Sequence, residues 1–425
     1  MPGLFTPLLL GIASAFVVSS VRADSPINPG FPYGSEKVRG VNIGGWLVLE
    51  PWITPSLFDN TGNDAIVDEW TFGKLQDRST AQAALKQHWD TFYTETDFGD
   101  IAAAGLNLVR LPIGYWAFEV GPGEPYIQGQ LPYLQKAIGW AGKYGLKVVI
   151  DLHGAPGSQN GYDNSGERIS FPTWHTNATN VARTNAILKT IAEMFTSNPT
   201  VVPLIAPLNE PAGYVGADML QVVKQYWRDS YGSIRYPHNS QESNTVVLIH
   251  DAFQTASYWS GFMTPPKFQG VAIDTHIYQV FSNSEVALSQ NQHIALACNQ
   301  SATLKEYDLN VIVGEWAPAI TDCATYLNGR GIGARYDGTH SNSRRVGSCT
   351  GMSGSADTFS ADYKMFLRKF WEAQVTAYET GAGWIQWLWK TEAGTGEEWA
   401  YASGLQYGWI PRNPTDRQYP RICPN

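Results

Sequence analysis

The chain has 425 residues, a length that suits one large domain or about three average ones. Hydrophobic residues make up 43% and aromatic residues 13%, so the chain can bury a large core and is not a disordered protein. Charged residues reach only 16% and the net charge is −9. Because phosphate groups require a basic surface, this balance excludes a nucleic-acid binder and favours a neutral partner that stacks on aromatic rings.

An apolar stretch at residues 4–18 opens the chain. It is too short for a comfortable membrane span, and the sequence Val21-Arg22-Ala23 after it has the small-residue pattern of a signal-peptidase site. We therefore expect residues 1–23 to be a secretory signal peptide; a buried N-terminal strand or helix is the alternative. No later apolar run reaches the length of a membrane span, so we expect a secreted chain without one.

Cysteines and glycosylation motifs fit the same compartment. Two sequons, at Asn177 and Asn299, are candidate glycan sites. The cysteine spacings match no zinc site, fit an oxidising environment and leave three possible disulfide pairings open. The four cysteines are Cys298, Cys323, Cys349 and Cys423.

Short apolar runs alternate with helical patterns along the chain. Eight runs rich in Val and Ile predict strands, at residues 38–43, 106–112, 147–152, 201–208, 245–250, 271–276, 311–315 and 383–389. Six stretches between them predict helices, at residues 80–104, 131–144, 179–197, 217–231, 285–307 and 357–380. The pattern predicts an α/β fold, a (β/α)8 TIM barrel that forms a single domain over residues 24–425. A doubly wound open sheet is the alternative, but no G-x-G-x-x-G follows the first predicted strand.

Polar residues stand at or just after the end of each predicted strand. In such a barrel the carboxyl ends of the strands form the active-site face, so we expect these side chains to meet there. They are Glu50, Arg110, Asp151, His153, Asn209, Glu210, His250, Asp251, Asp274, His276, Tyr278, Glu315, Trp387, Trp389 and Lys390.

Glu210 and Glu315 each end a strongly apolar strand. A carboxylate there is costly unless it is paired, hydrogen-bonded or protonated, and a structural ion pair with Arg or His is the alternative to a catalytic role. Two such carboxyl groups are what glycoside hydrolysis requires: one protonates the leaving oxygen, and the other attacks or stabilises the anomeric carbon. Arg110, if close to Glu315, would keep that glutamate ionised.

These residues carry a resemblance to glycoside hydrolase family 5, a retaining family of (β/α)8 barrels. Its motifs are similar to Asn209-Glu210-Pro211, Gly314-Glu315-Trp316 and Asp151-Leu152-His153-Gly154. Residues 39–46 with 49–52, residues 154–161 and residues 387–392 resemble the fungal secreted exo-β-1,3-glucanases within that family. The resemblance extends from about residue 36 to the C-terminus.

The resemblance implies roles for individual residues. Glu210 would be the acid/base and Glu315 the nucleophile. The subsite around the scissile bond would be lined by Arg110, His153, Asn209, His276 and Tyr278, and the terminal glucose would be held by Glu50, Asn164 and Trp389, with Trp387 beside the site. Tyr162 and Phe281 would form an aromatic clamp at the mouth, although a relative in the family has Phe where this chain has Tyr162. The disulfides would be Cys298–Cys423 and Cys323–Cys349.

We therefore expect a retaining hydrolase that releases glucose from the non-reducing ends of β-1,3-glucan by double displacement, with possible transfer to a sugar acceptor. We expect no cofactor and no metal, a β-glucan as its only partner, and a monomer. A same-fold enzyme for another linkage (a β-1,6-glucanase or a β-mannosidase-like enzyme), an endo-β-glucanase, and an inactive carbohydrate-binding wall protein remain alternatives. The loops at residues 154–175 and 321–356 would decide among the active enzymes, because they build the pocket walls.

Overall fold

The computed structural model describes residues 31–33, 35–238 and 242–423; the expected signal peptide at residues 1–23 lies outside this part of the chain. Eight parallel strands close into a barrel in sequence order. This confirms the predicted (β/α)8 architecture. The strands are β1 (Val38–Asn42), β2 (Leu108–Gly114), β3 (Lys147–Gly154), β4 (Leu204–Ala206), β5 (Val246–His250), β6 (Val271–Ile277), β7 (Asn310–Trp316) and β8 (Gly383–Gln386).

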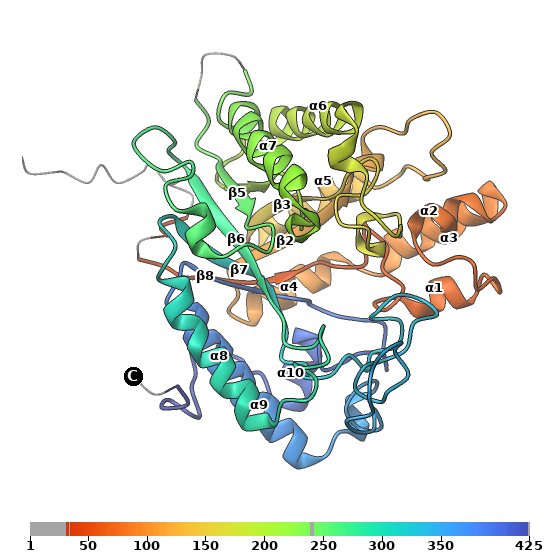
Figure 1. Cartoon of the computed structure of the whole chain (residues 1–425), viewed down its shortest axis with the longest axis vertical. Helices are drawn as coiled ribbons and strands as arrows, with labels where there is room; N and C mark the ends of the chain where they lie inside the picture. The colour runs from red at the N-terminus through yellow and green to blue at the C-terminus, as the bar shows by residue number, and fades with distance from the viewer. Residues whose placement is uncertain (1–30, 34, 239–241, 424–425) are drawn as a thin grey trace, which may run out of the picture.

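Helices surround the barrel, with α6 beside α7 and α8 beside α9 (Figure 1). The predicted helix at residues 80–104 is wrong as one element, because it divides into α3 and α4. Thr94 forms a capping box with Asp97 and starts a new helix there. The helices are α1 (Pro55–Asp59), α2 (Glu69–Lys74), α3 (Arg78–Thr91), α4 (Glu95–Ala103), α5 (Leu131–Lys143), α6 (Ala178–Phe195), α7 (Ala217–Arg235), α8 (Gln290–Leu304), α9 (Ala361–Tyr378) and α10 (Tyr401–Tyr407).

A long segment without helix or strand follows β7 and reaches the single-turn 3₁₀ helix at Ala356–Thr358. The disulfide Cys323–Cys349 closes this segment into a loop. A second disulfide, Cys298–Cys423, ties the C-terminal segment to α8. Both pairings are those that the family resemblance implies. Among the described residues, no helix combines the length and apolar character needed to cross a membrane.

The half of the barrel interior nearest the amino ends of the strands is apolar. Alternate strand residues point inward, and those nearest the amino ends of the strands form one hydrophobic cluster with Phe31 and Tyr33. Phe31 and Tyr33 precede β1 and pack against this cluster, where they contact each other with ring centroids 4.7 Å apart. The strand residues of the cluster are Val38, Leu108, Val149, Leu204, Ala206, Val246, Leu248, Ala272, Ile312 and Ile385.

Candidate active site

The inward-pointing positions become polar toward the carboxyl ends of the strands. In β2, Leu108 belongs to the apolar cluster and Arg110 follows two residues later; in β6, Ala272 is followed by Asp274 and His276 at the same spacing. The period of two in a strand therefore carries each strand from the apolar layer to a charged layer on the same inner face.

An irregularity between β6 and β7 aligns two of these residues. The register shifts after Thr275, so that His276 pairs with Glu315 instead of Gly314. Such bulges commonly redirect side chains beside active sites. Gly314 is required here, since a Cβ atom at this position would lie 1.9 Å from Oδ1 of Asp274.

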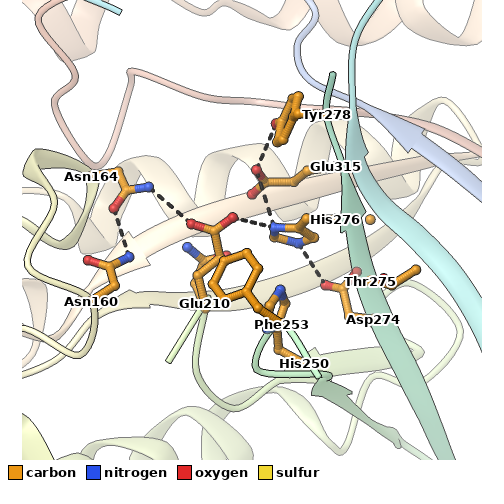
Figure 2. Close-up of polar contacts among 12 residues, drawn as sticks. Asn160, Asn164, Glu210, His250, Phe253, Asp274, Thr275, His276, Tyr278 and Glu315 are labelled. Carbon is orange, nitrogen blue, oxygen red and sulfur yellow. Dashed lines mark hydrogen bonds and ion pairs between the residues drawn. The ribbon is translucent and has the colours of Figure 1, made fainter. Parts of the chain in front are cut away.

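His276 lies between the two glutamates that the sequence singled out (Figure 2). Its Nδ1 atom is 2.7 Å from Oε1 of Glu210 and 3.5 Å from Oε2 of Glu315. Its Nε2 atom is 3.4 Å from Oδ2 of Asp274. On the far side of Glu315, the hydroxyl of Tyr278 donates to Oε2 at 2.9 Å. The two carboxyl groups therefore belong to one continuous polar cluster.

Arg110 contacts several members of this cluster and is fully buried. Its Nη1 atom donates to Oε1 of Glu315 at 2.7 Å, and its Nη2 atom donates to Oδ1 of Asn209 at 2.7 Å. The guanidinium also lies 3.2 Å from a carboxylate oxygen of Asp151 and 3.9 Å from one of Asp274. Because Arg presents several donors in a rigid plane, it fixes the positions of these groups together.

The protonation of the cluster follows from burial and charge. Burial raises the pKa of Glu315, against the lowering effect of His276 and Arg110. Burial acts the same way on Glu210, but the hydrogen bond and charge of His276 bring its pKa below the ordinary value. Burial opposes charge on His276, yet Glu315, Asp274 and Glu210 raise its pKa well above the ordinary value. These directions favour a protonated His276 that donates from Nδ1 to the carboxylate of Glu210 at 2.7 Å.

The backbone of Glu210 is strained. Its φ angle of 44° lies in the left-handed region, which costs a non-glycine residue about 1–3 kcal/mol and is typical of functional sites. Gln159 supports this turn, since its side-chain amide donates to the carbonyl oxygen of Asn209 at 3.0 Å. On the other side, Nδ2 of Asn164 approaches Oε2 of Glu210 at 3.4 Å (Figure 2).

A cavity of about 440 Å³ opens above the two glutamates. Both loops expected to build its walls do so: Arg168 comes from the loop after β3, and Arg335 from the loop after β7. Eight of the candidate residues line this cavity: Glu50, Tyr162, Asn164, Glu210, Tyr278, Phe281, Glu315 and Trp387.

Four other candidates, Arg110, His153, Asn209 and His276, lie packed behind the cavity lining with buried side chains. His153 donates from Nδ1 to Asp151 at 2.5 Å, and Asn209 donates to its Nε2 at 3.4 Å. The imidazole of His153 also stacks with the indole of Trp387, with ring centroids 5.7 Å apart. These residues therefore position the groups that face the cavity.

Trp389 requires a correction. Its ring stacks on Tyr401 and its indole N–H donates to Asp97 at 3.3 Å, so that it belongs to the packed shell and is absent from the cavity lining. The prediction extended the last strand to residue 389, but β8 ends at Gln386. The alternation of a strand does not continue beyond that point, and the indole of Trp399 joins the cavity wall instead.

Sequence reasoning did not single out several further residues of the wall, among them Trp52, Asp163, Tyr214, Phe253 and Trp399. Asp163 stands between Tyr162 and Asn164, so its position was a usable signal. Burial raises its pKa to about 7, and its Oδ2 atom has no hydrogen-bond partner among the described residues. Tyr214 follows Glu210 by only four residues in the sequence, and this closeness to a predicted catalytic residue could also have indicated a place at the site.

Glu50, which follows β1, also lines the cavity. Its Oε2 atom accepts a hydrogen bond from the indole of Trp52 at 3.0 Å. Burial, and after it the charge of Asp163, raises the pKa of Glu50 well above the ordinary value. Its Oε1 atom has no partner among the described residues. Glu50 and Asp163 thus each bring to the cavity lining a carboxyl oxygen to which no described residue is hydrogen-bonded.

Glu210, His250 and His276 bring potential metal-ligand atoms within 4.8 Å of one another. The geometry is not that of a ready-made metal site, because Nδ1 of His276 already bonds Glu210 and Nδ1 of His250 accepts from the N–H of Ala252 at 2.9 Å. A metal would have to break the hydrogen bond between His276 and Glu210.

Comparisons with known proteins agree with this geometry. The chain is 46% identical over 420 residues to a protein named probable glucan 1,3-beta-glucosidase A from Aspergillus niger, covering 98% of this chain and 97% of the relative. It is 45% identical over 399 residues to the glucan 1,3-beta-glucosidase of Blumeria graminis, covering 92% and 91%. The crystal structure of rutinosidase from Aspergillus niger has the same fold, with a TM-score of 0.68, 20% identity and coverage of 89% of this chain and 99% of that one.

Residues 73–329 match the family model described as cellulase, glycosyl hydrolase family 5. This match covers more than half of the chain, and the relatives above extend the similarity to nearly its whole length. The chain therefore belongs to glycosyl hydrolase family 5.

Proposed function

We propose that this chain is a secreted glucan 1,3-β-glucosidase that releases glucose from the non-reducing ends of β-1,3-glucan with retention of configuration. The observation that carries the proposal is the approach of Glu210 and Glu315 to the same nitrogen of His276, at 2.7 and 3.5 Å. Two oxygens that share a neighbour this closely lie nearer to each other than the roughly 6.5–9.5 Å between the carboxyl groups of inverting enzymes. The arrangement favours a nucleophile and an acid acting on one bond.

Glu315 is the proposed nucleophile. Arg110 and Tyr278 donate hydrogen bonds to its two oxygens at 2.7 and 2.9 Å, which stabilises the carboxylate and holds it in place. It attacks the anomeric carbon while Glu210 donates a proton to the glycosidic oxygen, whose bond to that carbon breaks. In the free protein this proton lies on His276, which passes it to Glu210 across their hydrogen bond.

The second step returns both glutamates to their starting state. Glu210 now takes a proton from a water molecule, and the oxygen of that water attacks the anomeric carbon and releases Glu315. A sugar hydroxyl that replaces water in this step would give transglycosylation. Asn209 is held by Arg110 and His153, and it directly precedes Glu210, so these contacts help to keep the acid in place.

Exo action is supported by the walls of the cavity. Segments after β1, β3, β6, β7 and β8 all contribute to it, through residues such as Glu50, Asn164, Phe281, Leu327 and Trp387. A cavity closed on several sides accepts the end of a chain more readily than its middle. Glu50 and Asp163 would accept hydrogen bonds from hydroxyls of the terminal glucose, and Trp387 would pack against its apolar face.

Secretion and modification complete the proposal. Residues 1–23 would be removed as a signal peptide, and two disulfides suit an oxidising compartment.

Asn177 is exposed and caps α6 by accepting from the N–H of Thr179 at 3.0 Å. That bond uses Oδ1 and leaves Nδ2 free for a glycan. Asn299 is also exposed, on α8. We propose that the mature chain acts as a monomer.

The decisive experiment follows the anomeric proton signals by NMR while the purified mature chain acts on a linear β-1,3-glucan. Glucose that appears first in the β form, as the only small product, is the expected result. Early oligosaccharides would replace exo with endo action, and early α-glucose would contradict retention. The absence of any product would contradict the proposed substrate and direct attention to other linkages.

A further inference from the structure

Two tyrosine hydroxyl groups meet at the rim of the cavity. Tyr162 follows β3, and Tyr214 lies in the short 3₁₀ helix Gly213–Val215 after β4. Both line the cavity, and 49% of Tyr162 and 54% of Tyr214 is exposed. The hydroxyl of Tyr214 donates to the hydroxyl oxygen of Tyr162 at 2.8 Å. Two exposed side chains from separate loops are therefore joined where the cavity opens.

Tyr214 is held in place by the same turn that carries Glu210. Just before Tyr214, the N–H of Ala212 donates to the carbonyl oxygen of Gln159 at 3.0 Å. The side-chain amide of Gln159 also donates to the carbonyl oxygen of Asn209, just before the strained Glu210. The ring of Tyr214 packs against Phe253, with ring centroids 5.7 Å apart. The hydroxyl of Tyr214 thus has a defined position relative to the glutamate.

The direction of the hydrogen bond leaves Tyr162 with a free donor. Its oxygen accepts from Tyr214, and its own hydrogen has no acceptor among the described residues. A hydroxyl that accepts one hydrogen bond becomes a better donor of another. Phe281 offers no such group on its side of the rim.

We propose that Tyr162 donates a hydrogen bond to the sugar next to the scissile bond on its leaving side, and that Tyr214 is the positioning residue that holds the Tyr162 hydroxyl there. This inference rests on the proposed glucosidase function and names a specificity determinant of that site. The pair would favour leaving groups that carry hydroxyls, such as a second glucose, over apolar aryl groups. Tyr214 contributes only through Tyr162, so its effect requires the Tyr162 hydroxyl.

A double-mutant cycle tests this coupling directly. The variants are Tyr162→Phe, Tyr214→Phe and the double substitution; each single substitution removes only one oxygen atom. Tyr144→Phe is the matched control, because Tyr144 is an exposed tyrosine at the end of α5 that takes no part in the cavity. Each protein is assayed on laminaritriose and on 4-nitrophenyl β-glucoside, whose leaving group lacks sugar hydroxyls.

On laminaritriose, Tyr162→Phe is expected to raise KM about fivefold, the usual effect of one lost hydrogen bond, with little change in kcat. Tyr214→Phe is expected to raise KM about twofold in the native background and to have no further effect when Tyr162 is already Phe. KM for the aryl glucoside should stay unchanged in all variants, as should every parameter of Tyr144→Phe.

Multiplicative effects of the two substitutions would overturn the positioning role of Tyr214. Equal losses on both substrates, or no loss on laminaritriose, would overturn the contact with the leaving sugar. A native protein that cleaves the aryl glucoside but not laminaritriose would instead contradict the proposed substrate, so the two failures are distinguishable.

Discussion

The two ends of the barrel interior follow opposite designs. The amino end is filled by aliphatic side chains such as Leu204 and Leu248, with Phe31 and Tyr33 packed against them. The carboxyl end contains the buried guanidinium of Arg110 within 4 Å of carboxylate groups of three residues: Asp151, Asp274 and Glu315. Both layers are formed by alternate residues of the same strands. The backbone therefore provides one scaffold, and side-chain chemistry alone separates a stabilising layer from a reactive one.

The difference shows what each end contributes. Apolar burial stabilises the fold by about 25 cal/mol per Å² of surface removed from water, and it needs no particular partner. Buried charges cost free energy unless each has a precisely placed counter-charge. At the carboxyl end, Arg110 and His276 supply these counter-charges. The two glutamates differ in pKa: that of Glu210 is lowered, chiefly by His276, whereas burial raises that of Glu315. We therefore expect substitutions at the charged end to affect rate most and those at the apolar end to affect stability most.

Glu315→Gln should give the largest effect on rate. Loss of the nucleophilic carboxylate is expected to lower kcat by more than about 10⁴-fold, as for other nucleophile variants. Folding should persist, because Arg110 keeps its contacts with Asp151 and Asn209. Initial rates on laminaritriose measure the loss, and circular dichroism verifies the fold. A folded variant with near-native rates would contradict the nucleophile assignment.

Glu210→Ala should have an effect that depends on the leaving group. General acid catalysis contributes about 10²–10⁴-fold, so cleavage of laminaritriose should slow by that factor. An activated aryl glucoside needs little protonation of its leaving oxygen and should lose far less in the glycosylation step. Pre-steady-state kinetics on both substrates separate that step from hydrolysis of the glycosyl-enzyme. Equal losses in glycosylation would argue against the acid role.

Leu204→Ala should produce the reverse pattern at the apolar end. Leu204 is fully buried in β4, and removing such a side chain lowers the free energy of unfolding by about 2–5 kcal/mol. KM and kcat at 25 °C should remain close to native values, because the residue lies below the charged layer. Urea denaturation measures the first effect. A large change in kcat without loss of stability would show that the two layers are not separable in this way.

Much of this division could be predicted from the sequence. The apolar runs located all eight strands, and polar residues at their ends located the site, because a parallel barrel brings those ends to one face. The prediction that Trp389 lines the site was wrong, because an apolar run does not reveal where β8 stops pairing. The shift that pairs His276 with Glu315 depends on contact between two strands. The bond between Tyr162 and Tyr214 joins two loops, and loop conformation is not encoded in periodicity.

The smallest expected effect concerns pH and tests how the charged end keeps its two glutamates distinct. Activity needs Glu315 ionised, and its pKa is raised by burial, so activity should fall as the pH drops through that raised value. Activity also needs the proton shared by Glu210 and His276, and the raised pKa of His276 places the alkaline loss above the pH at which an isolated histidine titrates.

His276→Asn should narrow this pH profile from both sides. Without the imidazolium, the pKa of Glu315 loses a lowering influence, and the acid limb moves to higher pH. The proton must then reside on Glu210 alone, a weaker base than histidine, and the alkaline limb moves to lower pH. Each limb is expected to shift by about one unit, as measured from kcat/KM on an aryl glucoside between pH 3 and 9. A uniform drop in activity with unchanged limbs would show that His276 only holds the carboxyl groups in place, and that the two glutamates are distinguished by Arg110 and Tyr278.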